Sequence, residues 1–243
     1  MVVMFESAGQ KFMFLNGGPH FKLNPSISFY VVCETTEEVD QAWEQLLERG
    51  TVLMPLDKYD WSEKYGWVQD KFGVNWQLSA GKMNEERQKF SPTLMFANSQ
   101  AGKAEQAIQF YTSVFENSSV VGIMRYSASD PDVEGTVKHA QFRLRERIFM
   151  AMDSSFPHSF SFNEAVSFVV DCETQEEIDF YWGKLSAVPE AEQCGWLKDQ
   201  FGVSWQIVPT ILGKLMSDPA RSERVVNVFM QMKKFDIEKL KLA

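Results

Sequence analysis

The side chains best placed for chemistry lie in a segment that occurs twice. Residues 66–78 read GWVQDKFGVNWQL and residues 195–207 read GWLKDQFGVSWQI, with eight of thirteen positions identical. Each copy carries an aspartate three residues before a glycine and ends in a Trp-Gln pair. Because an aspartate at such a position commonly accepts hydrogen bonds from turn N–H groups, turn capping by Asp70 and Asp199 is favoured over acid–base catalysis.

The glutamine of each Trp-Gln pair can both donate and accept hydrogen bonds. Side chains alternate along a strand, so Ser204 and Gln206 share one face of VSWQIV and Trp205 faces the other way. Gln206 either binds a ligand or satisfies buried backbone groups, and both interpretations stay open. For Trp196 and Trp205 packing is favoured over a stacking wall for an aromatic or cationic ligand.

The cysteines offer no clear site. Cys33, Cys172 and Cys194 form no CxxC pair, and their odd number argues against a set of disulfides, so we expect reduced thiols. Cys194 has no counterpart in the first copy, where Tyr65 stands. No histidine or basic residue adjoins Cys194 in sequence to lower its pKa, so a reactive thiol is not favoured there.

Composition narrows the class of partner. The chain has 243 residues, of which 44% are hydrophobic, enough for one large or two small domains. Its net charge of −9 opposes binding to nucleic acid, which depends on phosphate neutralisation. No segment approaches the roughly 18 apolar residues of a membrane span, and the first ten residues do not resemble a signal peptide. We expect a cytoplasmic protein whose partners are small molecules or proteins, not nucleic acid or membrane.

The elements that must position these side chains follow an order of strands and helices. Hydrophobic periodicity predicts, from residue 93 onwards, a strand at 93–97, a helix at 103–115, and strands near 119–126, 136–144 and 147–152. AVSFVVDCET at 165–174 predicts another strand, and Thr174 with Glu177 is the pattern of a capping box that opens a helix. GWLKD and VSWQI then form a closing hairpin.

The first copy repeats part of this order. The elements expected there are strands at 2–5, 11–15 and 27–33, a capping box at Thr35 and Glu38, and a loop at 51–65. The polar segment 81–91 is expected to be a linker, and a helix is expected between Ser217 and Ala243.

Spacing shows how the two copies differ. Cys33 and Cys172 lie 139 residues apart, whereas Trp76 and Trp205 lie only 129 apart. The first copy therefore carries about ten extra residues in the expected loop before residue 66. The domains predicted from these comparisons are an incomplete unit at 1–80, a linker at 81–91, a complete unit at 92–215, and a helical tail at 216–243.

Three segments, AVSFVVDCETQEEID, CGWLKDQFGVSWQIVPTILGKLM and MQMKKFDIEKL, resemble the PhnB-like branch of the vicinal oxygen chelate superfamily. Its members often carry the label 3-demethylubiquinone-9 3-methyltransferase. The resemblance implies an α+β fold of tandem β-α-β-β-β modules, which form cup-shaped mixed sheets with helices outside, plus the C-terminal helical tail. By this comparison the first unit lacks its opening strand, helix and second strand, and exposed edges would need cover, for example in a homodimer.

The wider superfamily suggests metal catalysis by His and Glu ligands that leave positions open for a substrate. The resemblance implies that Gln206 and Gln77 stand where metal-binding members usually carry a glutamate ligand. It also implies that the other ligand positions are occupied by Ala165, Ser26 and Pro92 or Thr93. A neutral amide is a poorer metal ligand than a carboxylate. We therefore predict no metal site and no cofactor, and a divalent metal is disfavoured.

The side chains expected to line the cup are Gln206, Ser204, Trp196, His139, Asp153, Ser167 and Gln77. The predicted function is binding of a small organic ligand in the cup, with catalysis left open. A metal-dependent lyase or dioxygenase and a purely structural role are the alternatives. Methyl transfer is disfavoured, because no Gly-rich turn of the kind that binds S-adenosylmethionine follows a strand and opens a helix.

Overall fold

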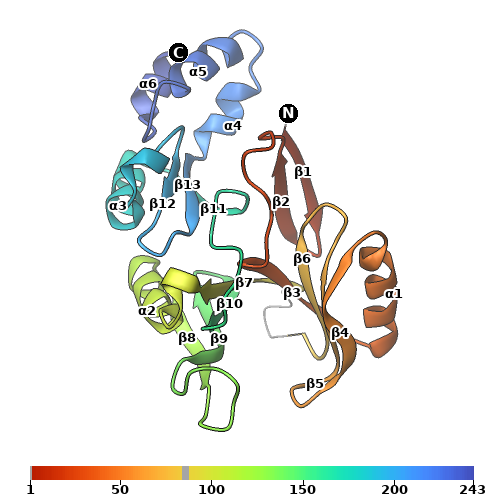
Figure 1. Ribbon diagram of the computed structural model, residues 1–243. Coiled ribbons are helices and arrows are strands. Elements are labelled where there is room, and N and C mark those ends of the chain that lie inside the picture. Colours follow the sequence, from red (N-terminus) through yellow and green to blue (C-terminus); the bar gives the residue numbers. More distant parts are fainter. Residues whose placement is uncertain (1, 84–87) are drawn as a thin grey trace. The chain divides into compact units, whose positions relative to one another are not determined.

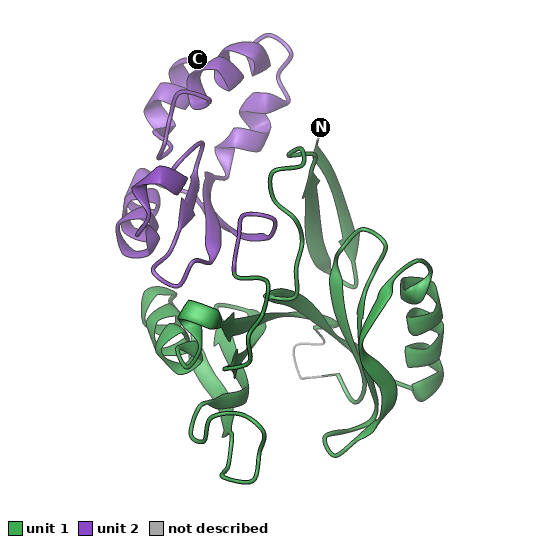
Figure 2. Cartoon of the chain, in the orientation of Figure 1, with its two compact units in different colours: residues 1–161 green, residues 162–243 purple. Residues whose placement is uncertain are grey.

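The computed structural model describes residues 2–83 and 88–243, which form two compact units (Figures 1 and 2). Unit 1 spans residues 1–161 and unit 2 spans residues 162–243. Unit 1 holds an eight-stranded sheet and a separate two-stranded hairpin, and unit 2 holds a three-stranded sheet.

The first half of the large sheet is a complete β-α-β-β-β module. Its elements are β3 (Ile27–Cys33), α1 (Thr36–Leu47), β4 (Thr51–Tyr59), β5 (Ser62–Gln69) and β6 (Asn75–Ala80). Strand β6 lies between β3, to which it is parallel, and β5, to which it is antiparallel, and β4 forms the edge. The capping residue expected before α1 is confirmed, because Thr35 Oγ1 accepts a hydrogen bond from the Glu38 N–H at 3.1 Å.

The loop expected at 51–65 is wrong, because most of this segment forms β4 and the start of β5. The pairing of β4 with β5 shifts register three times, and the strand contains Pro55. Both features are tolerated at a sheet edge, and both obscure the two-residue alternation by which a strand is recognised. The ten extra residues of the first copy are therefore essentially this edge strand.

The second module of unit 1 is also complete. Its elements are β7 (Phe90–Ala97), the 3-10 turn η1 (Asn98–Gln100), α2 (Ala104–Val114), β8 (Ser119–Arg125), β9 (Val137–Leu144) and β10 (Arg147–Ser154), which confirms the predicted helix and strands. The sheet order β7-β10-β9-β8 repeats that of the first module. Strands β3 and β7 pair antiparallel, with Ser28 opposite Thr93, and so join both modules into one sheet. A linker was expected at residues 81–91, and residues 84–87 of it lie outside the described residues. The domain boundaries predicted from the sequence stay predictions.

The N-terminal hairpin consists of β1 (Val2–Ser7) and β2 (Gln10–Leu15), which confirms the two expected strands. Its turn places Ala8 and Gly9 at φ 47° and 73°, the left-handed conformation that tight hairpins favour. Phe12 packs edge-on against Phe29 and Phe90, at ring-centroid distances of 5.7 and 5.4 Å. These aromatic contacts attach the hairpin to the central strands β3 and β7.

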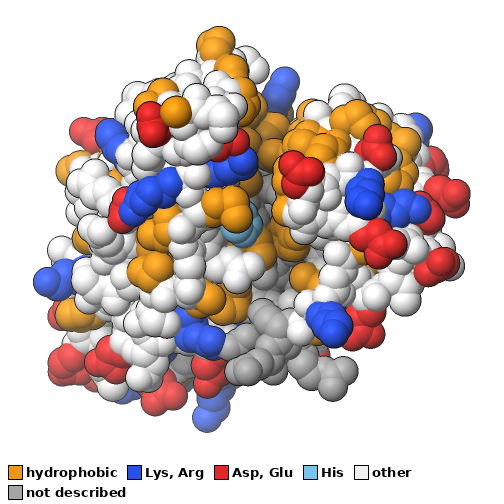
Figure 3. Space-filling view, turned by 90° about the horizontal axis from the view of Figure 1, so that it is seen from below, with side chains coloured by type: hydrophobic (Ala, Val, Ile, Leu, Met, Phe, Trp, Pro, Cys, Tyr) orange, Lys and Arg blue, Asp and Glu red, His pale blue; other side chains and the backbone are white. Residues whose placement is uncertain are grey.

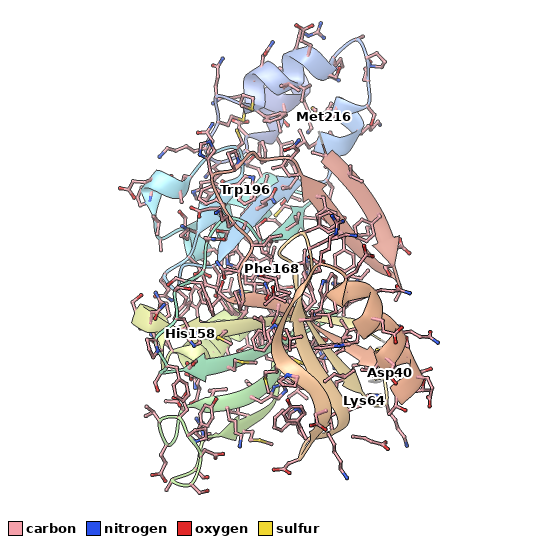
Figure 4. All side chains as sticks on the ribbon, turned by 45° about the vertical axis from the view of Figure 1, so that its right-hand side comes forward. Asp40, Lys64, His158, Phe168, Trp196 and Met216 are labelled. Atoms are coloured by element: carbon pink, nitrogen blue, oxygen red, sulfur yellow. The ribbon has the colours of Figure 1, made fainter. Side chains whose placement is uncertain are left out.

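Helix α1 covers one face of its module. Its Val39 and Trp43 pack in one buried cluster with Val31, Cys33 and Leu78 from the strands. Asp40 of α1 also forms an ion pair with Lys64 of β5 at 2.5 Å (Figure 4). Because side chains alternate along a strand, the even-numbered residues of β3 and the odd-numbered residues of β6 point away from the helix.

Unit 2 contains a shorter module followed by the C-terminal helices. Its elements are β11 (Ser167–Cys172), α3 (Gln175–Leu185), the 3-10 turn η2 (Pro189–Ala191), β12 (Trp196–Lys198), β13 (Ser204–Pro209), α4 (Ile211–Met216), α5 (Ser222–Phe229) and α6 (Ile237–Leu242). The strand order β11-β13-β12 matches β3-β6-β5 without a counterpart of β4. The predicted capping box at Thr174 and Glu177 is confirmed. The α+β fold of repeated β-α-β-β-β modules with a helical tail is confirmed as well.

The C-terminal tail is helical, but the single helix expected there is divided. Helix α5 ends at Phe229, and the side chain of Asp236 caps a separate helix α6 by accepting from the Lys239 N–H at 3.0 Å. Between these helices Phe235 packs so closely on Gly195 that an added Cβ would lie 2.3 Å from its ring. The glycine that opens the second repeated hairpin is therefore required by tail packing.

Both repeated hairpins are held by the same carboxylate clamp. One oxygen of the aspartate accepts hydrogen bonds from the N–H groups two and four residues later, and the other accepts from the indole N–H six residues later. In the first hairpin the carboxylate of Asp70 accepts from the backbone N–H groups of Phe72 and Val74 at 2.9 and 3.0 Å and from the Trp76 indole at 2.9 Å. In the second hairpin the carboxylate of Asp199 accepts from the backbone N–H groups of Phe201 and Val203 at 2.9 and 3.0 Å and from the Trp205 indole at 2.8 Å. This confirms turn capping and also gives the indole N–H groups of Trp76 and Trp205 their partner.

The cysteines form no disulfide among the described residues, as expected. Cys33 and Cys172 are buried, with 1% and 0% of their surface exposed, while Cys194 is half-buried. Burial, with a smaller contribution from the negative charge of Glu38, raises the pKa of the Cys33 thiol to about 11. Thiolate formation, and with it reactivity, is therefore suppressed at Cys33.

The clamp predicts a large loss of stability on substitution of its aspartate. Asp199→Ala leaves two turn N–H groups and the Trp205 indole N–H without their acceptor in a buried hairpin, which should cost about 3 kcal/mol of unfolding free energy. Urea unfolding followed by tryptophan fluorescence measures the loss. Asp171→Ala, at an exposed position of the same unit, is the control, and an equal effect of both variants would contradict the clamp.

Thiol accessibility gives a second prediction. At pH 8 a thiol-specific chromogenic reagent should titrate one cysteine of the native chain, Cys194, and all three after unfolding in guanidinium. Cys194→Ser should abolish the reaction of the native protein without changing the buried thiols. Fast modification of two or more cysteines in the native wild type would show that Cys33 or Cys172 is accessible.

Candidate functional site

The candidate site is the face of the eight-stranded sheet that α1 and α2 leave uncovered. Helix α2 packs on the other face, where Tyr111 stacks on Phe142 of β9 at a centroid distance of 6.5 Å. Alternation along β9 therefore places His139 on the uncovered side. In the space-filling view of Figure 3, hydrophobic side chains border a hollow.

A buried hydrogen-bond chain forms the floor of this face. The Tyr65 hydroxyl donates to Gln77 Oε1 at 2.8 Å, and Gln77 Nε2 donates to Ser28 Oγ at 2.8 Å. The three side chains come from β5, β6 and β3 and are 4%, 2% and 1% exposed. Burial, and then the neighbouring hydroxyls of Tyr30 and Tyr59, raise the pKa of Tyr65. Tyr65 therefore stays a neutral phenol that donates to Gln77.

Apolar side chains surround the floor. Trp67, Met95 and Ala97 form a buried cluster, and Met54, Met152 and Phe160 pack against it. The register puts Trp67 opposite Gln77, so the indole shares the face of the hydrogen-bond chain. Its Nε1–H is buried and has no hydrogen-bond partner within the described residues. This face therefore combines a hydroxyl- and amide-lined floor with a sulfur- and aromatic-rich wall.

The predicted cup residues of unit 1 fall on different faces. Gln77 lies at the centre of the floor, and His139 lies on the same face, where burial lowers the pKa of its imidazole. Asp153 instead accepts hydrogen bonds from the N–H groups of Ala104, at 3.0 Å, and Val137, at 2.9 Å. Asp153 thus fixes the start of α2 on the helix-covered side, and burial outweighs these hydrogen bonds and raises its pKa.

The remaining predicted residues meet in unit 2. Gln206 Nε2 donates to Ser167 Oγ at 2.8 Å, which repeats the Gln77–Ser28 bond. Trp196 lies opposite Gln206 in the pairing of β12 with β13, and Figure 4 shows Trp196 on this three-stranded sheet. Ser204 is 1% exposed, and its hydroxyl has no partner among the described residues. The residues predicted for one cup are therefore divided between two units.

Sequence reasoning missed Tyr65, Ser28 and Trp67. Signals for them were present, because Tyr65 and Trp67 alternate in YGWVQ immediately before the repeated aspartate. Ser28 stands at the position equivalent to Ser167, with the 139-residue spacing of the cysteine pair. The sequence does not show which strands pair, and this pairing is what brings the three side chains to one face.

The residues at the centre of this face do not fit a divalent transition metal. Strand pairing brings Ser28, Thr93 and Met150 side by side, next to Gln77. Hydroxyls, an amide and a thioether are weak ligands compared with imidazole, carboxylate or thiolate. Nowhere in residues 2–83 and 88–243 do three His, Cys, Asp or Glu side chains group as metal ligands would.

Burial of His139 predicts a pH dependence. Its pKa in the folded chain is lowered below the ordinary 6.5, so the unfolded chain binds more protons and folding stability falls as the pH drops below 6.5. Thermal unfolding between pH 7 and pH 5 should show a smaller loss of stability for His139→Gln than for the wild type. His20→Gln, at an exposed position, should keep the wild-type dependence, and an unchanged His139→Gln profile would contradict the assignment.

Comparisons with known proteins identify the family. The family model described as 3-demethylubiquinone-9 3-methyltransferase matches residues 1–79 and 88–208. A PhnB protein from Bacillus cereus is 44% identical over 51% of this chain and all of its own, with a TM-score of 0.44. A gene product from Arabidopsis thaliana is 22% identical over 50% of this chain and 98% of its own, with a TM-score of 0.34.

Glyoxalase I from Zea mays is 11% identical over 85% of this chain and 76% of its own, with a TM-score of 0.49. A search of curated proteins finds no match. The family match extends over both modules of unit 1 and the strands of unit 2. The chain therefore belongs to the family described as 3-demethylubiquinone-9 3-methyltransferase, the PhnB-like group that its sequence resembles.

Proposed function

We propose that the uncovered face of unit 1 binds a small, uncharged organic molecule without a metal ion. The observation that carries this proposal is the chain from Tyr65 through Gln77 to Ser28. It holds three polar side chains in a fixed arrangement beneath an apolar wall. A few convergent polar groups in a mainly apolar concave surface are typical of small-molecule sites.

The unpartnered donor on this face indicates one group of the ligand. The Trp67 Nε1–H is buried beside Met95 and Met152, and a buried donor without an acceptor costs free energy. A carbonyl oxygen of the ligand would satisfy it. The methionine and aromatic side chains around Trp67 would then contact an apolar or aromatic body, for which thioethers are adaptable partners.

The charge state of the face supports an uncharged ligand. Burial keeps Tyr65 protonated by raising its pKa and keeps His139 neutral at pH 7 by lowering its pKa. Gln77 and Ser28 carry no charge. A charged ligand placed on this floor would lose its hydration without gaining an opposite charge from these four residues.

The activities suggested by the wider family receive less support. A metal-dependent lyase or dioxygenase requires ligands that the central residues do not supply. The family description names methyl transfer to a demethylated ubiquinone, but the sequence lacks the Gly-rich turn of common S-adenosylmethionine sites. We therefore propose ligand binding and assign no reaction.

The cellular location of the protein and its classes of partner are also proposals. Within the described residues, no helix has the length and apolar character needed to cross a membrane. The cytoplasmic location and the lack of nucleic-acid partners stay predictions from composition, and the net charge of −9 supports the latter.

Substitution of Trp67 tests the proposed site. Acetophenone and 1,4-naphthoquinone, two uncharged aromatic carbonyl compounds, should bind the full chain in calorimetric titration, and benzoate should bind more weakly. Trp67→Phe removes the N–H but keeps an aromatic ring, so the affinity should fall about tenfold. Trp182→Phe, at a half-buried position of α3 in unit 2, is the matched control and should leave the affinity unchanged.

Three outcomes would contradict the proposal. The first is binding that survives Trp67→Phe unchanged, and the second is no binding of either carbonyl compound. The third is a large rise in melting temperature on addition of nickel, zinc, manganese or iron that is reversed by a chelator. This third result would support the metal-dependent alternative, because an ion that binds the folded chain stabilises it.

A further inference from the structure

A cavity of unit 1 lies at a corner where the segment before β3, the end of α1, the start of β4 and the turn between β5 and β6 meet. Its volume is about 510 Å³, which is within the range of small-molecule sites. Three cations, Lys22, Arg49 and Lys71, line this corner together with one carboxylate, that of Asp70. The four side chains therefore carry an excess of positive charge, in a chain whose net charge is −9.

The carboxylate of Asp70 serves the turn itself. One of its oxygens accepts from the N–H groups of Phe72 and Val74, and the other accepts from the Trp76 indole. Charge-assisted hydrogen bonds of this kind hold a carboxylate in a fixed orientation. Both oxygens of Asp70 are therefore directed at donors of the hairpin.

Unit 2 contains an equivalent corner, which shows what the fold requires there. Asn24 Oδ1 accepts a hydrogen bond from the Ser26 N–H at 2.8 Å, and Asn163 Oδ1 accepts one from the Ala165 N–H at 2.9 Å. The two asparagines have the 139-residue spacing of the repeat. The carboxylate clamp shapes the adjoining hairpin turn in both units. The same local structure therefore forms at both corners.

Two of the three cations are specific to the corner of unit 1. By the 139-residue spacing Lys22 corresponds to Ser161, and by the 129-residue spacing of the hairpins Lys71 corresponds to Gln200. The same turn and the same approach to the opening strand form with neutral side chains at both positions. Formation of the local structure therefore does not explain the two lysines.

Arg49 is positioned by the way α1 ends. Its φ of 59° is left-handed, a conformation that glycine or asparagine usually provides after a helix. Gly50 follows, and an added Cβ there would lie 2.6 Å from the Gln69 carbonyl oxygen. This close approach fixes the end of α1 against β5, whose Gln69 also lines the cavity. The backbone of Arg49 is thus held at the corner, while its side chain is 75% exposed.

Exposed aromatic side chains adjoin these charges. Phe21 and Phe72 line the same cavity and are 51% and 75% exposed, whereas Phe201, the counterpart of Phe72, is 1% exposed. The Nζ of Lys71 lies 5.6 Å from the centroid of the Phe72 ring, so the turn presents a cation and an aromatic ring together. A ligand that covers the two phenylalanine rings would remove apolar surface from water.

We propose that this corner binds a small aromatic phosphate monoester. Such an ester carries about two negative charges at neutral pH, which matches the excess of positive charge, and an arginine guanidinium can bind two phosphate oxygens at once. The aromatic part of the ligand contacts Phe21 and Phe72. The corner shares no residue with the uncovered face proposed for uncharged ligands, so the two sites are independent.

Calorimetric titration of the full chain with phenyl phosphate at pH 7.5 tests the site. Phenyl phosphate should bind with a Kd below about 1 mM at low salt, and more weakly at high salt, because exposed charges are screened. Benzoate has one charge less and inorganic phosphate has no ring, so each should bind at least about threefold more weakly. No binding of phenyl phosphate, or equal binding of benzoate or inorganic phosphate, would overturn the proposal.

The repeat supplies variants that should fold normally. Lys22→Ser and Lys71→Gln introduce the residues that the second copy carries, and each should weaken phenyl phosphate binding at least about threefold by removing one charge. Lys58→Gln makes the same change of charge at an exposed position of β4 outside the cavity and should leave the affinity unchanged. An equal loss in Lys58→Gln would show that only the net charge of the chain matters. Lys71→Gln should not alter binding of 1,4-naphthoquinone, which separates this site from the uncovered face.

Glu48 provides a variant with the opposite sign. Its carboxylate lies 3.8 Å from Lys71 Nζ and 3.9 Å from Arg49 Nε, distances that attract both cations but are longer than hydrogen bonds. Glu48→Gln removes this competing charge, so phenyl phosphate should bind about twofold more tightly. A merely structural role of the corner predicts no such gain. An affinity that falls or stays unchanged in Glu48→Gln would contradict the roles assigned to Lys71 and Arg49.

Discussion

The antiparallel contact between β3 and β7 is the constraint on which unit 1 depends. It places Ser28 beside Thr93 at the centre of an eight-stranded sheet, where each is 1% exposed. Polar side chains buried this deeply must find hydrogen-bond partners, and Gln77 supplies one to Ser28. The same contact leaves a face free of helices and thereby creates the hollow proposed as the binding site. Loss of the contact would separate the modules and expose the polar floor.

Much of the fold could be predicted from the sequence, because its signals are local. The capping pair at Thr174 and Glu177 and the clamp at Asp199 each lie within a few residues. Strand β4 could not be recognised, since Pro55 and repeated register shifts hide its alternation. The candidate site was predicted least well. The chain from Tyr65 through Gln77 to Ser28 is complete only after β3 has paired with the β5–β6 hairpin, and no local pattern encodes the pairing of β3 with β6.

The eight-stranded and the three-stranded sheet contain equivalent glutamine–serine hydrogen bonds, but the surroundings of the two glutamines differ. Gln77 is 2% exposed in unit 1, whereas the equivalent Gln206 is half-buried in unit 2, although both donate to a serine at 2.8 Å. The difference follows from what lies beyond the opening strand, because β3 has β7 beside it and β11 has no neighbour there among the described strands. A glutamine in this position therefore links the closing strand to the opening strand in both sheets, whether or not a second module encloses it.

The carboxylate clamp also has a consequence for the order in which the chain folds. Asp199 and Trp205 are six residues apart, so the turn between them can close on the microsecond timescale of hairpins. The parallel pairing of β3 with β6, by contrast, joins Phe29 to Trp76 across 47 residues, and contacts of such separation form slowly. We expect each closing hairpin to form first and to present a ready edge on which the opening strand then assembles. The most closely repeated segment of the sequence would thus act as the nucleus of the two modules that carry it, the first module of unit 1 and the module of unit 2.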